Sequence, residues 1–286
     1  MQLCVTTRGI ARIARSPRSA EEPVLDLLLP DCFDLASQLE NGSLEHLAAV
    51  KPVESFPMSK AEMLPPIAAP GQIVIAGLNY HAHCREIGRP VPDNLMFAVG
   101  PGTGVSHANA PIRLPAEAPN EVDYEGEIAI VIGSRATRVP ASKAWSVVAG
   151  LTPLNDVSAR DIQAAGTALA VIRAKAFPTF KPFGPALATL DEFADPLDIG
   201  LRTRVNGELR QEVRSSDMVF SLPEIIETVT AKNTLEPGDV ICTGTPGGVA
   251  HGGRHPYLVA GDVIEIEIEG LPPLVNRVEC LETEKP

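Results

Sequence analysis

The chain has 286 residues and 44% of them are hydrophobic, so one large domain or two smaller ones can each bury a core. Its 24 Lys and Arg residues against 36 Asp and Glu residues give a net charge of −12, without any Lys/Arg-rich segment, which argues against nucleic-acid binding. The five cysteines form no CxxC pair, and neither a signal peptide nor a membrane-spanning stretch is recognisable, so we expect a cytoplasmic protein that does not bind membranes.

The first part of the chain, residues 1–69, is predicted to be a small N-terminal α/β domain with a linker. A strand is expected at 2–7, and short helices are expected at 34–40 and 43–50. The segment 51–70 contains five prolines, which is typical of an extended linker.

Residues 70–286 are predicted to form the main, catalytic domain. Strands are expected at 73–76, 122–132 and 201–205, and helical segments at 81–87, 141–148, from Asp156 or Ser158 to 165, and at 222–230. Asn206-Gly207 is a hairpin signal. Because strands and helices do not alternate strictly, the pattern favours an α+β fold or a β-roll over a doubly wound sheet.

An unusual acidic pattern occupies the stretch VDYEGEIAIVIG, which begins at Val122. Glu125 and Glu127 lie on one face of the predicted strand, roughly 7 Å apart at a rise of ~3.3 Å per residue. After Glu127 the strand is apolar on both faces, whereas the similar stretch VIEIEIEG, which begins at Val263, alternates until a glycine ends it. The second stretch is typical of a solvated face, and the first one indicates carboxylates at the edge of a buried region.

Two buried carboxylates would raise each other's pKa unless a cation lay between them. Oxygen ligands favour Mg²⁺, Mn²⁺ or Ca²⁺, and the absence of an HExxH pattern or a cysteine cluster argues against zinc. A third acid is available in PLNDVSARDIQ as Asp156 or Asp161. Asp156 has an alternative role as a helix N-cap, and spacing alone leaves that choice open.

The residues from about Gly71 to the end of the chain resemble the fumarylacetoacetate hydrolase family. The matching stretches, in chain order, are GLNYHAHCRE, VDYEGEIAIVIG, NDVSARDIQ, RAKAFPTFKPFGP, VNGELRQ and LEPGDVICTGTPGGV. The resemblance implies the mixed β-roll of the family's C-terminal domain, assembled as a homodimer. It also implies a Mg²⁺ or Mn²⁺ site formed by Glu125, Glu127 and Asp156, with Ca²⁺ as a substitute.

The same resemblance implies roles for residues around that site. His83 and Glu86 match the family's catalytic pair, in which the carboxylate orients the imidazole, and their spacing of three would place them on one face of a helix. Lys175 matches a lysine that reaches substrate oxygens. His81 is out of register and is given a minor role.

Four further positions are expected to bind substrate. Arg160 and Gln163 match residues of the helix after the metal-binding aspartate, although Arg160 has the alternative of an ordinary ion pair with Asp161 or its neighbours. Gly244 and Thr245 belong to the glycine turn TGTPGG, whose amides and hydroxyl could hold a carboxylate, with a plain turn as the alternative.

The function implied is metal-dependent hydrolysis of a carbon–carbon bond in an acylpyruvate, a 2-oxo acid with a second carbonyl. His83, assisted by Glu86, would activate water in such a reaction. Two alternatives stay open: a decarboxylase or isomerase with the same site, and a non-catalytic, metal-stabilised binding protein.

Overall fold

The computed structural model describes residues 1–14, 22–39 and 43–280. Residue 40, the predicted end of the helix at 34–40, and residues 281–286 lie outside the described part of the chain.

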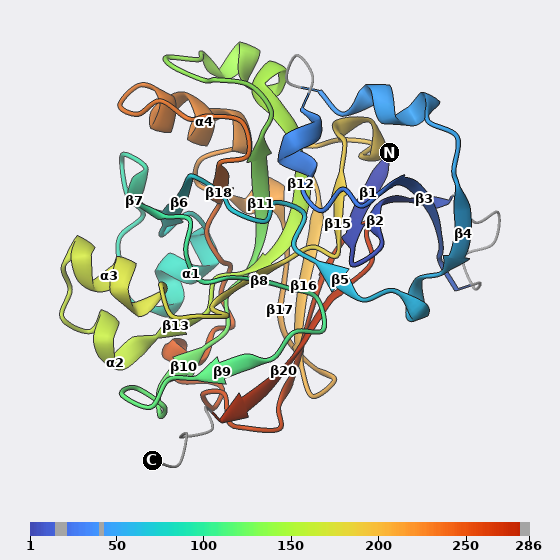
Figure 1. Cartoon of the computed structure of the whole chain (residues 1–286). Helices are drawn as coiled ribbons and strands as arrows, with labels where there is room; N and C mark the ends of the chain where they lie inside the picture. Colours follow the sequence, from blue (N-terminus) through green and yellow to red (C-terminus); the bar gives the residue numbers. More distant parts are fainter. Residues whose placement is uncertain (15–21, 40–42, 281–286) are drawn as a thin grey trace.

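One large mixed sheet forms the framework of the molecule, and its central strands carry the site (Figure 1). Its main strand order is β4-β3-β2-β1-β15-β12-β11-β18-β6-β7. The strands are β1 (Gln2–Thr6), β2 (Gly9–Ala14), β3 (Val24–Pro30), β4 (Glu54–Pro57), β6 (Gln72–Gly77), β7 (Met96–Pro101), β11 (Gly126–Ile132), β12 (Val148–Asn155), β15 (Ala186–Ala188) and β18 (Val240–Cys242), with β5 (Met63–Leu64), β8 (Val105–His107) and β14 (Lys181–Phe183) attached beside them.

A second sheet of five strands packs on β11 and β12. Its order is β17-β16-β19-β20-β9, formed by β9 (Ile112–Leu114), β16 (Gly200–Val205), β17 (Glu208–Arg214), β19 (Val263–Ile268) and β20 (Leu274–Cys280). A two-stranded ladder joins β10 (Val122–Asp123) to β13 (Ser158–Ala159). This mainly β, mixed arrangement confirms the predicted α+β class.

Helices are short and lie around the sheets (Figure 1). The α-helices are α1 (His81–Glu86), α2 (Arg160–Gln163), α3 (Ala168–Ala174) and α4 (Leu222–Thr230). The 3-10 helices are η1 (Leu35–Gln38), η2 (Glu45–Ala49), η3 (Met58–Lys60), η4 (Ala141–Val147), η5 (Leu190–Glu192), η6 (Ser215–Asp217) and η7 (Ala250–Gly252). Among the described residues, none of the helices has the length and apolarity needed to cross a membrane.

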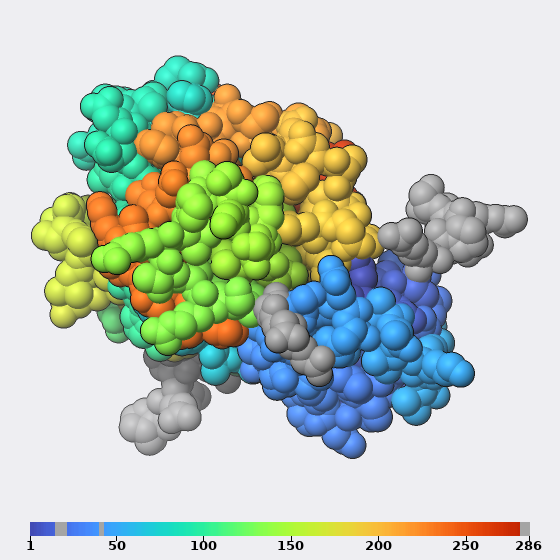
Figure 2. Space-filling view, turned by 90° about the horizontal axis from the view of Figure 1, so that it is seen from above, coloured from blue at the N-terminus to red at the C-terminus, as the bar shows by residue number. Residues whose placement is uncertain are grey.

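The N-terminal residues, coloured blue, gather on one side of the molecule (Figure 2). They are nevertheless continuous with the large sheet, because β1 pairs with β15 through Gln2–Ala188 and its neighbours. The division of the chain at residues 69 and 70 therefore stays a prediction.

Strand β11 is buried along its whole length, as the loss of polar residues after Glu127 predicts. Ile128, Ile130 and Ile132 belong to one apolar cluster, whereas Ala129 and Val131 belong to another. Both faces are covered because β16 and β19 of the second sheet contribute to the first cluster, whereas N-terminal residues such as Leu35 and Leu47 contribute to the second.

The predicted continuous strand at 122–132 is wrong in one detail, because the chain forms β10 and β11 with Tyr124 and Glu125 between them. The Glu125 amide donates to the Asn155 side chain at 2.9 Å, and the Glu125 carbonyl accepts from the Asp156 amide at 2.9 Å. These bonds replace a regular ladder at the end of the strand.

The helix predicted from Asp156 or Ser158 to 165 is also shorter than expected. Ser158 belongs to β13, and α2 begins at Arg160 after Ala159, which makes no side-chain cap. By contrast, α4 has the predicted bounds.

The predicted hairpin at Asn206-Gly207 is confirmed. The two residues connect β16 to β17 with φ angles of 53° and 80°, the left-handed values that this dipeptide adopts readily.

Gly126 packs directly against β16 of the second sheet. An added Cβ would lie 2.1 Å from Thr203 Oγ1 on β16. We expect Gly126→Ala to lower the free energy of unfolding by about 1–3 kcal/mol through overpacking. The double variant Gly126→Ala/Thr203→Ala should recover part of that loss, because the clashing hydroxyl is removed. Urea unfolding of the wild type, the two single variants and the double variant measures the interaction free energy between the two positions. Simple additivity of the two substitutions would contradict the predicted contact.

Candidate active site

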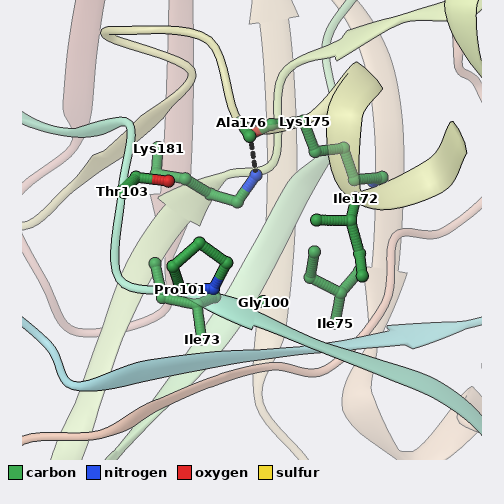
Figure 3. A pocket seen from close by; sticks show the side chains of 9 residues that line it. All are labelled: Ile73, Ile75, Gly100, Pro101, Thr103, Ile172, Lys175, Ala176 and Lys181. Carbon is green, nitrogen blue, oxygen red and sulfur yellow. Dashed lines mark hydrogen bonds between the residues drawn. The ribbon is translucent and has the colours of Figure 1, made fainter. Parts of the chain in front are cut away.

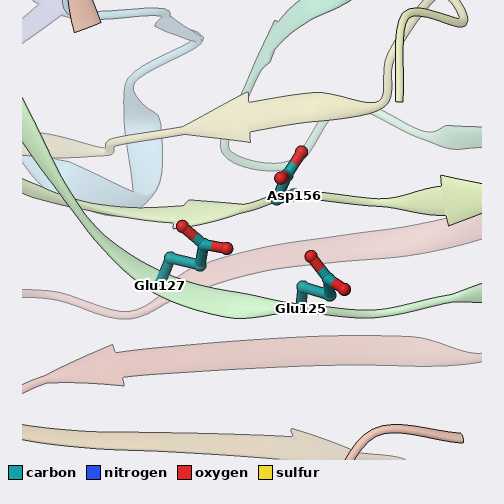
Figure 4. Close-up of side chains that lie close together, drawn as sticks. All are labelled: Glu125, Glu127 and Asp156. Atoms are coloured by element: carbon teal, nitrogen blue, oxygen red, sulfur yellow. The ribbon is translucent and has the colours of Figure 1, made fainter. Parts of the chain in front are cut away.

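Three carboxylates meet where β11 and β12 lie side by side (Figure 4). Glu125 precedes β11, Glu127 is its second residue and Asp156 directly follows β12. The antiparallel register pairs Gly126 with Asn155, and this places Asp156 next to Glu125. One oxygen from each carboxylate lies within 4.8 Å of the others.

The three side chains are shielded from water, with residue exposures of 5% for Glu125, 1% for Glu127 and 0% for Asp156. Burial raises the pKa of Glu127 well above its ordinary value, and the charges of Asp156 and Glu125 raise it further. A divalent cation among these oxygens would relieve the repulsion. The donor set therefore fits Mg²⁺ or Mn²⁺, which prefer oxygen ligands.

Asp156 rather than Asp161 joins the two glutamates. Asp161 is exposed, and its Oδ1 accepts a local hydrogen bond from the amide of Ile162. The alternative role of Asp156 as an N-cap is wrong, because α2 begins four residues later and the Asp156 carboxylate faces the acidic cluster.

Three cations surround the carboxylates. Lys175, the residue after α3, contacts Glu125 and donates to Asp156 Oδ2 at 2.6 Å. Arg160 Nη2 lies 2.7 Å from Glu125 Oε1. Lys181 on β14 contacts Asp156 Oδ1. Burial alone would raise the pKa of Glu125, but Lys175 and Arg160 outweigh it and lower the value to about 2.

Asp123 fixes the orientation of Arg160. Its fully buried carboxylate accepts from Arg160 Nε at 2.9 Å and from the amides of Ala250 and His251 at 2.9 and 3.0 Å. Arg160 thus forms ion pairs, as the alternative from sequence has it, but with Asp123 and Glu125 rather than with Asp161. Gln163 Oε1 accepts from Arg160 Nη1 at 2.7 Å.

His83 and Glu86 lie on α1 at the predicted spacing, with His83 Nδ1 3.5 Å from Glu86 Oε2. The amide of Gly248 donates to both oxygens of Glu86, at 3.0 and 3.1 Å. Burial opposes the ionisation of Glu86, but the hydrogen bonds from His83 and Gly248 prevail and lower its pKa. After the larger effects of burial, Lys175 and Arg160, the charge of His83 also lowers the pKa of Glu125.

The glycine turn supports the acid strand from the other side. The amide of Gly244 donates to Glu127 Oε2 at 2.9 Å. Thr245 Oγ1 donates to the carbonyl of Gly126 at 3.1 Å and accepts from Gln211 Nε2 at 2.8 Å. In these contacts both residues position the strand, so their role in substrate binding stays a prediction, as does that of Arg160 and Gln163.

Several residues of the site are not predicted from the sequence. Asp123 is visible as one acid of the alternating stretch, but nothing in its spacing distinguishes a buried anchor from a solvated residue. Lys181 is signalled only by its place among apolar residues in KAFPTFKPF. His251 lies close enough to Arg160 and His83 for their charges, after burial, to lower its pKa.

The comparison with known families agrees with this geometry. Residues 72–279 match the model described as fumarylacetoacetate (FAA) hydrolase C-terminal. The chain belongs to the fumarylacetoacetate hydrolase family. The predicted family and its fold type are therefore confirmed.

Similar proteins carry several related names. The chain is 38% identical to "Oxaloacetate tautomerase FAHD2B, mitochondrial" of Bos taurus over 261 residues, which cover 91% of this chain and 82% of the relative. It is 38% identical to "Oxaloacetate tautomerase YisK" of Bacillus subtilis over 228 residues, which cover 78% of this chain and 75% of the relative.

Two solved structures share the fold. A 2-hydroxyhepta-2,4-diene-1,7-dioate isomerase from Mycobacterium marinum has a TM-score of 0.79 and 33% identity over 99% of this chain and 100% of its own. A maleylpyruvate hydrolase from Sphingobium sp., in complex with manganese (II) ion and pyruvate, has a TM-score of 0.77 and 28% identity over 98% of this chain and 99% of its own. The chain is thus a member of an enzyme family whose relatives include tautomerases, isomerases and hydrolases.

The raised pKa of Glu127 predicts how the metal-free protein responds to pH. A pKa above the unfolded value means that protonated Glu127 stabilises the fold at low pH and that this contribution is lost as pH rises through the raised pKa. In the presence of a chelator, Glu127→Gln should therefore raise the melting temperature more at about pH 8 than at about pH 5.

Added Mn²⁺ should raise the melting temperature of the wild type, and this rise should largely disappear in Glu127→Gln. Glu279→Gln, on the exposed end of β20, is the matched control and should behave as the wild type. The same Mn²⁺-dependent rise in Glu127→Gln and wild type would contradict the role of Glu127 as a ligand.

Proposed function

We propose that the chain is a divalent-metal-dependent enzyme that interconverts the keto and enol forms of a 2-oxo acid of the oxaloacetate type. The observation that carries the proposal is the pairing of His83 with Glu86 near three buried carboxylates. Such a site combines a proton carrier with a place for a Lewis acid. The names of the relatives at 38% identity support the same reaction class.

Glu125, Glu127 and Asp156 would hold the Mg²⁺ or Mn²⁺ ion. When bound, the ion supplies Lewis-acid stabilisation of negative charge on the substrate's carboxylate and 2-oxo oxygens.

The chain's own residues move the proton. The reaction removes the hydroxyl proton of the enol and places one proton on C3, so atoms and charge balance without a further reactant. His83 is the carrier, since neutral imidazole accepts a proton and imidazolium returns it. Glu86, fixed by the amide of Gly248, orients the ring.

Lys175 would donate to a substrate oxygen. Its amine already lies between Glu125 and Asp156, and burial, although unfavourable to its charge, is outweighed by these carboxylates, which raise its pKa. The raised pKa favours the charged form of Lys175, and a cation at this position would stabilise negative charge on a substrate oxygen.

Hydrolysis of the carbon–carbon bond of an acylpyruvate is the second candidate. Its specific support is the fixed position of Glu86. A His83 side chain oriented by Glu86 could take a proton from a water molecule, and the resulting hydroxide would attack the distal carbonyl of the substrate. One of the similar solved structures is named a maleylpyruvate hydrolase. Decarboxylation needs no attacking water and has no comparable support in the contacts of His83.

A homodimer remains the proposed assembly. A cytoplasmic location remains proposed as well, and the five free cysteines of the described chain are compatible with it.

The test of the proton carrier is His83→Ala. We expect it to lower kcat for ketonisation of enol-oxaloacetate by about 10²–10⁴-fold, because general-base and general-acid transfer is lost. Binding of Mn²⁺ and of oxalate should persist, since His83 is not among the residues proposed to hold the metal ion. Stopped-flow ultraviolet absorbance of the enol measures the rate, and calorimetry measures binding.

His81→Ala is the matched control on the same helix, and it should retain most of the wild-type rate. An equal loss in the two variants would remove the special role of His83. Rapid release of pyruvate from an acylpyruvate by the wild type, without ketonisation of oxaloacetate, would replace the tautomerase by the hydrolase.

A further inference from the structure

Lys181 is a buried lysine that the proposed reaction does not use. Strand β14 holds its backbone, which pairs with Val105 on β8 and donates to the carbonyl of Gly104 at 2.8 Å. The residue is only 2% exposed. Its stem and that of Lys175 line a small pocket that is otherwise largely apolar, with Ile73 and Pro101 among its walls (Figure 3).

The amine of Lys181 ends on two groups. It donates to the carbonyl of Lys175 at 2.6 Å and contacts Asp156 Oδ1. The other oxygen of Asp156 accepts from Lys175 at 2.6 Å. Asp156 is therefore held from both oxygens, and its orientation depends on both lysines.

Lys181 also changes the charge of the site. Four carboxylates with at most 5% exposure lie together with three cations of at most 4% exposure: Asp123, Glu125, Glu127 and Asp156 with Arg160, Lys175 and Lys181. With all seven groups ionised, the formal charge is four negative against three positive, or −1. A divalent cation changes it to +1, whereas without Lys181 the loaded site would be neutral.

Electrostatic interactions are strong at this spacing where water is excluded. The ammonium of Lys181 repels an incoming divalent cation, because the two share the carboxylate of Asp156. Once that cation is bound, the same ammonium favours a dianionic ligand. The effects on cation and anion therefore have opposite signs, which no loss of packing would reproduce.

We propose that Lys181 is a positioning residue that orients Asp156, weakens the binding of the divalent cation and strengthens the binding of dianionic 2-oxo acids by the loaded site. This inference rests on the proposed function. It gives a function to a buried lysine whose charge needs compensation by a carboxylate and a carbonyl.

The experiment is calorimetric titration of the metal-free full chain with Mn²⁺, followed by titration of the Mn²⁺-loaded protein with oxalate. In Lys181→Gln we expect Mn²⁺ to bind about tenfold more tightly and oxalate about tenfold more weakly, the size expected when one nearby charge is removed. The amide of Gln keeps a hydrogen-bond donor but no charge.

Two controls separate charge from structure. Lys181→Arg keeps the charge and should bind both ligands within about threefold of the wild type. Lys143→Gln removes one charge from the exposed surface, and this variant should also bind Mn²⁺ and oxalate within about threefold of the wild type. If Lys181→Gln does not give native circular dichroism, Lys181→Met, which matches the stem, carries the same prediction.

Unchanged or weaker Mn²⁺ binding in the folded neutral variant would overturn the role of Lys181 and leave the metal-dependent function intact. Absence of Mn²⁺ binding in the wild type would overturn both.

Discussion

The structure depends on the burial of Asp123, Glu125, Glu127 and Asp156 within one small region. Their mutual repulsion and desolvation oppose folding unless cations and hydrogen-bond donors surround them. Arg160, Lys175 and Lys181 supply the cations, and the amides of Gly244, Ala250 and His251 supply donors. Glu127 is the member that the chain compensates least, since its charge is opposed by both neighbouring carboxylates. The arrangement is that of a site built to receive a further positive charge.

The backbone makes this concentration of charge geometrically precise. The register of β11 and β12 brings residues about thirty positions apart in sequence into contact, and Gly126 allows the second sheet to approach between the two glutamates. The turn at Gly244 and Thr245 then fixes the strand, while Gly248 in the same loop holds Glu86. One short loop thus connects the carboxylate cluster with the proposed proton carrier, and displacement of that loop would disturb both parts together.

Much of this could be predicted from sequence because the relevant signals are local. The apolar run after Glu127 predicts a strand covered on both faces, and Asn206-Gly207 predicts a hairpin. The grouping of Glu125, Glu127 and Asp156 is predicted from the acid pattern together with the family resemblance. What could not be predicted depends on tertiary contacts: the break at Tyr124 and Glu125 requires the side chain of Asn155, and the short α2 reflects the pairing of Ser158 in β13. The contacts of Asp123 and Lys181 likewise involve partners distant in the chain, such as His251 and Asp156.

We propose that Glu125, Glu127 and Asp156 together bind one divalent cation beside His83. Anomalous X-ray diffraction from crystals grown with Mn²⁺ and oxalate tests it most directly. We expect a single strong anomalous peak within coordination distance of one oxygen from each of the three carboxylates, with oxalate completing the coordination shell on the side of His83. An anomalous peak elsewhere, or three carboxylates neutralised only by Lys175 and Lys181 at saturating Mn²⁺, would contradict it.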